Sequence, residues 1–543
     1  MKNRSRTAIA VALISFLLGA IWLSGQQSDD RPLPALFPPG ALLYLEAKNL
    51  RGLVTQWNSS GEKRAWPSSD NFGVLSRSRL VQRLGEARDQ FATAAGIPVA
   101  FNLLEELAGG RSAFAFYDLA NLKFVYLTNL QSSRLEASEL WRSRTRYQQR
   151  SVAGIRFYVD SDAATHRTIA FAHFNDWLIV STAEEQMAQT LALVSGVQTA
   201  GLAIEPWFSN VAKQAPSQGD LRLVYHLNTL LPTPQFRTYW LQKNASALKE
   251  FTSGTADLFR KPDAFEEQRV LLRRTPETVS SPAPSLTSIL WYVPPSSSLY
   301  RAWVAPDRDL ITETLQQVVL GEPATTQRLN RIAPQISLEN PNAGTGSEFE
   351  TRIDRPPFQR AQSESVKVLV DAVMNMQPIK LLHIQTTVPL DDSVFVTPQS
   401  GVVIECLRPD LATLERSLAS VTGILRTGSL DPLQSSVSGN ALILTRLPIA
   451  RSTGTVWQIP EGATYAAAFD RRIEWPRYKQ LFNLIDRTPQ NPETTPGQNT
   501  PPFFSGNLQS LGNVLSSLQR ASIVSREESS QVRESVRYEM NAP

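Results

Sequence analysis

The chain has 543 residues, of which 42% are hydrophobic and 8% aromatic, and it carries a formal net charge of +4. This length and composition predict a folded protein with enough hydrophobic core for about two to four domains. The small net charge gives no indication of nucleic-acid binding, and we expect no nucleic-acid partner. The single cysteine, Cys406, excludes an intramolecular disulfide.

The N-terminus has the features of a membrane anchor. Basic residues among the first six precede an uninterrupted apolar run over residues 7–23, and Asp29 and Asp30 follow it. A helix of about 17 residues spans roughly 26 Å, slightly less than a hydrocarbon core about 30 Å thick. The charge asymmetry predicts that the N-terminus stays in the cytoplasm and that the rest is exported to the periplasm or cell exterior. We therefore predict a single-pass protein of the inner (cytoplasmic) membrane.

The residues after the apolar run favour a retained anchor over a cleaved signal. Signal peptidase requires small residues at the −3 and −1 positions, and neither Ser24 nor Gly25 has a small residue two positions before it. Trp22 lies where an interfacial aromatic residue would end a spanning helix. Cleavage stays open as the alternative, whereas the lack of a cysteine after the run excludes a lipoprotein.

Three stretches rich in Pro, Ser, Thr, Asn and Gly lack a hydrophobic period and divide the exported chain. The predicted organisation is a cytoplasmic tip and single-span anchor over 1–29, a first α+β region over 30–274, a linker over 275–288, a second α+β region over 289–486 with a mobile insertion at 321–365, a Pro/Thr/Asn-rich linker over 487–505, and a C-terminal helix and hairpin over 506–543.

A local unit recurs in these regions: a Pro-rich turn, a short apolar strand and a capped amphipathic helix. The three clearest copies begin at Phe37, Val293 and Ile459, so they are roughly 256 and 166 residues apart. This irregular spacing disfavours a solenoid with a fixed repeat. We predict an α+β fold of duplicated units, each an antiparallel sheet with helices packed on one face.

The motifs of the common exported enzymes are missing from the sequence. None of the four histidines lies in an H-E-x-x-H pattern, and there is no G-x-S-x-G elbow or phosphate-binding loop. Gly344 and Gly346 lie in the predicted insertion without a third glycine or a following helix. We therefore expect no metal site, no cofactor and no catalytic residue that can be named from a motif.

Two Ser-x-x-Lys patterns resemble the start of the catalytic motif of penicillin-binding proteins. They are Ser60 to Lys63 and Ser246 to Lys249, the second in a predicted helix. The companion Ser-x-Asn and Lys-Thr-Gly elements do not follow in workable order. Because so short a pattern arises by chance in a long chain, we expect neither serine to be catalytic.

Two segments combine aromatic, basic and amide side chains in a way that suits a polar ligand surface. Flat aromatic faces stack on sugars, while amides and arginines bind hydroxyl or acid groups. The candidate residues of the first segment are Trp57, Asn58, Arg64, Trp66, Asp70, Arg77 and Arg79, and those of the second are Arg237, Tyr239 and Trp240. The alternative is an ordered loop that Trp57 and Trp66 attach to the core.

The same segments carry a resemblance to a known family. The run 57–80, the Gly109-Gly110 turn, and residues 236–240 followed by 257–260 resemble large exported, membrane-anchored bacterial proteins described only as a domain of unknown function. The resemblance implies a bacterial envelope setting and provides no activity, catalytic residue or binding residue.

The function predicted from the sequence is that of a non-enzymatic, membrane-anchored envelope protein. Residues 7–23 would contact the membrane, and the exported domains would bind a protein, a polymer such as a glycan, or a lipid. The main alternative is an envelope hydrolase or acyl-transferase whose nucleophile lies outside any recognised motif. A lipid carrier is a third possibility, and it would require an apolar cavity between sheet and helices.

Overall fold

The computed structural model describes residues 31–65, 72, 76, 79–215, 218–234, 248–277, 284–320, 357–389, 394–422, 433–447, 449, 459–487 and 515–541. The predicted anchor at 7–23 lies outside these residues. None of the helices in the described part is long and apolar enough to cross a membrane. Residues 357–365, which we expected in the insertion, belong to a helix. Residues 321–356 of the insertion, 278–283 of the first linker and 488–505 of the second lie outside the described residues.

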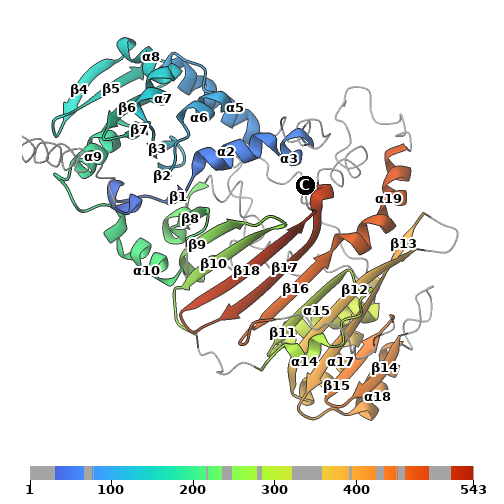
Figure 1. Cartoon of the computed structure of the whole chain (residues 1–543). Coiled ribbons are helices and arrows are strands. Elements are labelled where there is room, and N and C mark those ends of the chain that lie inside the picture. Colours follow the sequence, from blue (N-terminus) through green and yellow to red (C-terminus); the bar gives the residue numbers. More distant parts are fainter. Residues whose placement is uncertain are drawn as a thin grey trace, which may run out of the picture.

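One antiparallel sheet of 18 described strands extends across the molecule (Figure 1). The mixed α+β class with a large antiparallel sheet is therefore confirmed. Every neighbouring pair of strands is antiparallel. In spatial order the strands are β4 (Gln148–Val152), β5 (Ile155–Asp162), β6 (Arg167–Phe174), β7 (Trp177–Ser181), β3 (Lys123–Asn129), β2 (Ser112–Asp118), β1 (Leu43–Ala47), β8 (Leu221–Tyr225), β9 (Phe251–Arg260), β10 (Ala264–Arg273), β18 (Gln531–Met540), β17 (Leu518–Glu527), β16 (Tyr465–Asp470), β11 (Leu299–Val304), β12 (Pro378–Pro389), β13 (Val396–Cys406), β15 (Ala441–Thr445) and β14 (Gln434–Ser438).

The strand pairing around β1 recurs around β11. Strand β1 lies between β2 and β8, and β8 continues through β9 to β10. Strand β11 likewise lies between β12 and β16, and β16 continues through β17 to β18. The two halves meet where β10 pairs with β18, which are corresponding strands. The third predicted unit, near Ile459, contributes β16, whose place in the sheet matches that of β8 rather than that of β1.

Helices cover both faces of the sheet in the N-terminal half, whereas we expected them on one face. They are η1 (Leu33–Leu36), α2 (Leu50–Ser59), α3 (Gly61–Ala65), α5 (Arg79–Ala95), α6 (Phe101–Leu107), α7 (Ser132–Ala137), α8 (Glu139–Arg142), η2 (Ser143–Arg146), α9 (Glu184–Val194), η3 (Leu202–Ile204), α10 (Pro206–Gln214) and α11 (Leu227–Leu230). Strand β6 shows the cause. Its Ile169 and Phe171 pack in one core with α5 to α8, while Ala170 and Ala172 pack in another with η1, α9 and α10. Because consecutive residues are apolar, both faces must be covered.

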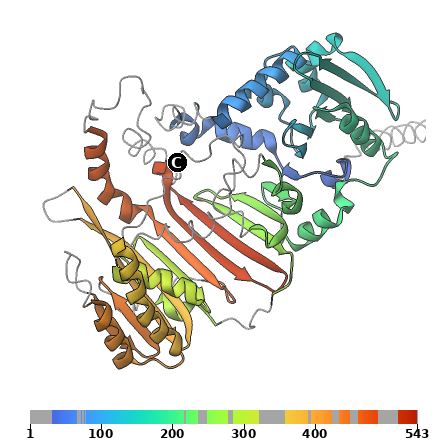
Figure 2. The ribbon, with the colours of Figure 1, turned by 180° about the vertical axis from the view of Figure 1, so that it is seen from behind.

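In the C-terminal half, helices also pack on both faces of the sheet. They are α14 (Thr287–Leu290), α15 (Arg308–Leu320), α17 (Pro357–Asn375), α18 (Leu411–Thr422), α19 (Arg471–Arg487) and η6 (Leu515–Ser517). Helices α15, α17 and α18 lie across one face, where Leu381 and Ile404 are completely or almost completely buried (Figure 2). On the opposite face, Leu382 and Val403 form a second core with α14.

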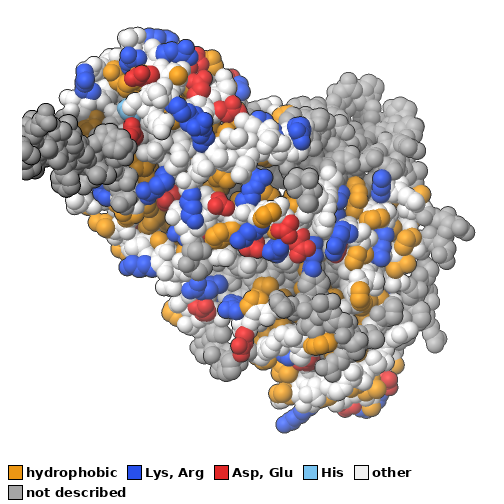
Figure 3. Space-filling view, in the orientation of Figure 1, with side chains coloured by type: hydrophobic (Ala, Val, Ile, Leu, Met, Phe, Trp, Pro, Cys, Tyr) orange, Lys and Arg blue, Asp and Glu red, His pale blue; other side chains and the backbone are white. Residues whose placement is uncertain are grey.

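Ion pairs reinforce the seam between β10 and β18. Arg269 contacts Glu534 at 3.3 Å, and Arg273 contacts Glu527 at 3.1 Å. Arg537 bridges back to Glu266 and, at 3.8 Å, to Asp263. Figure 3 shows acidic and basic side chains side by side over the middle of the molecule, where Figure 1 draws these strands. The two halves are thus joined by backbone pairing, by complementary charge and by a small apolar cluster in which Val532 of β18 packs with Leu227 and Phe251.

A buried charged pair lies next to this seam, on β8 and β9. Asp257 is 1% exposed and accepts two hydrogen bonds from the Arg222 guanidinium, at 2.7 and 2.8 Å. It also accepts the main-chain N–H of Gly219 at 2.8 Å. This bidentate geometry compensates for the desolvation of both charges.

We predict that Asp257→Ala destabilises the protein strongly, because it leaves the Arg222 guanidinium, 15% exposed, without its bidentate partner. A loss of about 3 to 5 kcal/mol in the free energy of unfolding is expected. Denaturant unfolding monitored by tryptophan fluorescence measures it. The control is Asp89→Ala, which removes an exposed pair with Arg88 and should cost at most about 1 kcal/mol. Equal losses in the two variants would contradict the prediction.

His383 lies on β12 and is 2% exposed. Its Nε2 atom has no hydrogen-bond partner among the described residues. Burial lowers the pKa of His383 to about 3, and the positive charge of Arg301 contributes in the same direction. The folded protein therefore holds this imidazole neutral, whereas in the unfolded chain it titrates near pH 6.5.

This difference in the pKa of His383 between the folded and unfolded states predicts that the protein loses stability in acid. The unfolded state binds the proton more tightly, so the stabilisation by neutral His383 is complete above about pH 6.5 and is lost as the pH falls toward 3. The total contribution is of the order of 4 to 5 kcal/mol. His383→Leu should flatten the dependence of unfolding free energy on pH between 6.5 and 4. A wild-type dependence on pH in His383→Leu would contradict the prediction.

Candidate functional site

The structure places only part of the predicted aromatic and basic segments. Trp57 and Asn58 lie on α2, Arg64 on α3, and Arg79 opens α5. The remaining candidates lie outside the described residues: Trp66, Asp70, Arg77, Arg237, Tyr239 and Trp240. Helices α2 and α3 pack against each other, and α6 packs beside α2.

Helix α2 begins directly after β1 and is fixed at its N-terminus. The Asn49 side chain accepts the N–H of Gly52 at 3.0 Å and caps the helix. The N–H groups of Leu50 and Arg51 donate to the carbonyl oxygens of Gly110 and Gly109. A side chain at Gly109 would lie 2.0 Å from the carbonyl oxygen of Asn129, so only glycine allows this close approach.

Three large apolar side chains on α2 and α6 are exposed to solvent. Trp57 is 44% exposed, Phe101 42% and Leu104 39%. Phe101 and Leu104 are one turn apart and therefore lie on the same side of α6. We call these three residues the α2–α6 surface. The sequence analysis identified Trp57 but missed α6, although the i, i+3 spacing of Phe101 and Leu104 was available as a signal.

Polar contacts hold α2, α3 and α6 together around this surface. The Asn58 amide donates to the Glu105 carboxylate of α6, and the Lys63 ammonium donates to the Asn58 carbonyl. The same ammonium lies 4.8 Å from the centre of the Phe101 ring, which is a cation–π contact. Asn58 thus joins the helices that present the exposed apolar groups.

The first Ser-x-x-Lys pattern does not form a catalytic pair. The Ser60 hydroxyl donates to the carbonyl of Trp57 at 2.7 Å and accepts the main-chain N–H of Lys63 at 3.1 Å. It ends α2 and caps α3, while the Lys63 side chain binds Asn58. In the second pattern, Ser246 lies outside the described residues and Lys249 is exposed.

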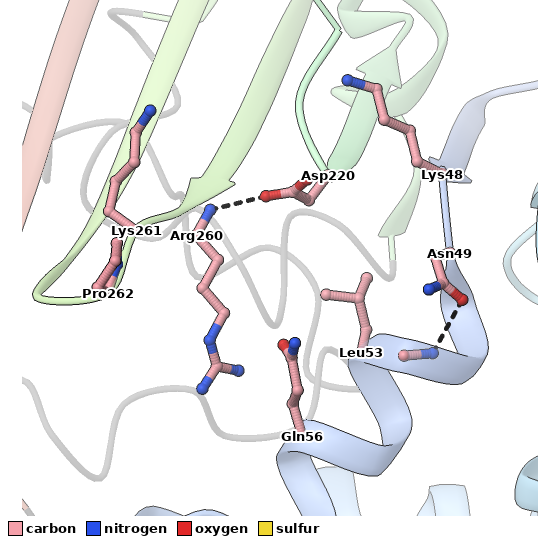
Figure 4. Close-up of a pocket in the computed structure, with 9 residues that line it drawn as sticks. Lys48, Asn49, Leu53, Gln56, Asp220, Arg260, Lys261 and Pro262 are labelled. Carbon is pink, nitrogen blue, oxygen red and sulfur yellow. Dashed lines mark hydrogen bonds between the residues drawn. The ribbon is translucent and has the colours of Figure 1, made fainter. Parts of the chain in front are cut away.

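A pocket of about 400 Å³ lies between α2 and the β9–β10 turn (Figure 4). It is lined by Lys48, Asn49, Gly52, Leu53, Gln56, Asp220, Arg260, Lys261 and Pro262. Sequence reasoning missed this site, because its residues come from three separated segments. Leu53 lies one turn before Trp57 on α2, so the pocket and the α2–α6 surface share this helix.

The side chains of the pocket differ in direction. Figure 4 shows the Arg260 guanidinium and the Gln56 amide opposite each other, whereas the Lys48 and Lys261 side chains point away. The Lys48 ammonium donates to the carbonyl of Gln218 at 2.6 Å, and the Asp220 carboxylate accepts the main-chain N–H of Arg260 at 2.8 Å. The Arg260 guanidinium lies 5.5 Å from the centre of the Phe265 ring and makes no hydrogen bond or ion pair within the described part of the chain.

A serine, a lysine and a carboxylate converge elsewhere, where α14 packs on β12 and β13. The Ser288 hydroxyl donates to Glu405 at 2.8 Å, and the Lys380 ammonium contacts both Ser288 and, at 2.7 Å, Glu405. Lys380 is 6% exposed. The serine hydroxyl and the lysine ammonium are thus both directed at the same carboxylate. The cluster attaches α14 to the sheet.

Comparison with known proteins gives no family for this chain. No family model matches it, and the search of curated proteins found no match. Two solved structures that it matches are crystal forms I and III of TP0453, at 12% and 11% sequence identity. They cover 46% and 49% of this chain and 82% and 86% of their own chains, with TM-scores of 0.25 and 0.24. Such low scores support no conclusion about fold or function, and the resemblance to envelope proteins of unknown function stays a prediction.

We predict that Ser60 has a structural role as a helix cap. Ser60→Ala should lower the free energy of unfolding by about 1 kcal/mol, whereas Ser60→Asp, which keeps a capping oxygen but no hydroxyl nucleophile, should be close to the wild type. Chemical denaturation of the three proteins tests this. Equal destabilisation by both substitutions would show that the cap is not what Ser60 provides.

Proposed function

We propose that this chain is a membrane-anchored binding protein of the bacterial envelope and that it engages a partner protein through the α2–α6 surface. In this proposal residues 7–23 form the anchor and the two halves of the sheet are duplicated units exported from the cytoplasm. The observation that carries the binding role is the exposure of Trp57, Phe101 and Leu104 on neighbouring helices.

Exposed tryptophan and phenylalanine side chains are costly in water and are typical of protein interfaces, where they fill pockets of the partner. The surrounding groups fit this use. Lys63 and Asn58 form a polar edge, and their mutual contacts keep α2, α3 and α6 in a fixed arrangement before a partner binds. A protein partner with an apolar segment flanked by acidic residues complements this surface.

The alternative of an envelope hydrolase or acyl-transferase requires a nucleophile with a base that can accept its proton. Ser60 caps a helix, and Ser288 donates to Glu405, which also forms an ion pair with Lys380. Neither arrangement favours acyl transfer. No observation in the described residues supports this alternative over binding.

Site-specific crosslinking in cells tests the proposal. A photoreactive amino acid at position 104 should crosslink to one dominant envelope protein, because Leu104 lies within the surface. Adding Trp57→Ser and Phe101→Ser should reduce that crosslink at least tenfold without a change in the thermal unfolding temperature. The matched control places the photoreactive group at Val197, which is 72% exposed and lies on the loop after α9. The proposal fails if positions 104 and 197 give the same products, or if the double substitution leaves the crosslink intact.

A further inference from the structure

The pocket beside α2 lies next to a set of main-chain hydrogen bonds that occurs twice in the protein. We call this set the backbone frame. In the N-terminal half, the N–H of Lys48 donates to the carbonyl of Asp220, whose own N–H donates to the carbonyl of Leu258. In the C-terminal half, the N–H of Val304 donates to the carbonyl of Thr464, whose N–H donates to the carbonyl of Ser525. The junction of the first strand with its helix is therefore built by the same hydrogen bonds in both halves.

The correspondence extends into the two hairpin turns. The N–H of Arg260 donates to the Asp220 side chain at 2.8 Å, and the N–H of Glu527 donates to the Thr464 side chain at 3.2 Å. The next residues, Lys261 and Glu528, each donate their N–H across their turn at 2.8 Å. Arg260 thus corresponds to Glu527, and Lys261 to Glu528.

The corresponding side chains carry opposite charges and have different partners. Glu527 pairs with Arg273 at 3.1 Å, and Glu528 pairs with Arg533 at 3.1 Å. Both carboxylates of the C-terminal turn therefore have an arginine as ion-pair partner. In the N-terminal turn, Lys261 reaches Glu266 only at 3.9 Å, and the Arg260 guanidinium has the Phe265 ring as its contact within the described residues. In the C-terminal half the turn residues on this frame are acidic and ion-paired. In the N-terminal half the corresponding residues are basic and line a pocket.

We infer that the pocket between α2 and the β9–β10 turn binds an oxyanion, a carboxylate or phosphate group, through Arg260 and Gln56. The guanidinium offers several N–H donors in one plane, and the Gln56 amide opposite it adds another donor (Figure 4). Lys48 and Lys261 add positive potential at the rim, and Asp220 is the single carboxylate among the lining residues. This inference goes beyond the proposed docking surface and does not depend on it.

Isothermal titration calorimetry of the full-length chain in neutral detergent, at fixed ionic strength, tests the inference. The probes are inorganic phosphate and succinate, and the one that binds more tightly identifies the chemical source of the oxyanion. The key variant is Arg260→Glu with Lys261→Glu, which introduces the residues found at the corresponding positions of the C-terminal half. A second variant, Gln56→Leu, removes only the opposing amide. The control, Arg88→Glu with Arg416→Glu, makes the same change in net charge at exposed sites elsewhere.

We expect saturable binding of at least one probe, a loss of at least tenfold in the Arg260/Lys261 variant, a smaller loss in Gln56→Leu, and wild-type affinity in the control. Unchanged thermal unfolding temperatures show that the variants are folded. The inference is overturned if neither probe binds saturably, or if the control weakens binding as much as the pocket variant. Because Trp57 and Phe101 are intact in all these proteins, crosslinking at position 104 is expected to persist, so failure here leaves the proposed docking surface standing on its own test.

Discussion

The backbone pairing of β10 with β18 is the constraint on which the rest of the structure depends. Without it, each half would end in a hairpin strand whose outward-facing N–H and C=O groups lack strand partners, and such edges promote aggregation. The pairing makes one sheet of two half-sheets and aligns corresponding strands across the seam. Ion pairs such as Arg269 with Glu534 then favour this register, because a slip of one residue would move each charge to the opposite face of the sheet.

The helices that cover the sheet determine which surfaces of the protein remain free to bind a partner or ligand. Helices cover both faces of the outer strands of each half, whereas the central strands β10, β17 and β18 are mostly half-buried. Helix α2, which follows the first strand of the N-terminal half, lies at the boundary between core and solvent, whereas its counterpart α15 is largely buried. In the N-terminal half this position brings α2 beside α6 on one side and beside the β9–β10 turn on the other. The exposed aromatic groups and the basic pocket therefore share a helix that the sheet holds rigidly through Asn49 and the Gly109–Gly110 turn.

Comparison of the two halves distinguishes the main-chain contacts that both halves share from the side chains that differ between them. The main-chain hydrogen bonds at the strand–helix junction are the same in both, since they complete the sheet and begin the helix. The side chains on that frame differ: Glu527 and Glu528 are neutralised by arginines, whereas Arg260 faces a pocket. The shared main-chain bonds indicate that the junction itself is structural, and the difference in charge agrees with the binding role inferred for Arg260.

The sequence by itself determined the class of the fold, the short strands and the helix caps, because these depend on local patterns such as Pro-rich turns, short apolar runs and a capping residue like Asn49 before a helix. It also provided one member of the candidate surface, Trp57. Only the tertiary structure decided that β16 takes the place of β8, that helices cover both faces, and that Arg260, Gln56 and Asp220 meet in one pocket. These features depend on contacts between segments up to about two hundred residues apart, and no local pattern encodes which distant strand or turn will lie beside a given helix.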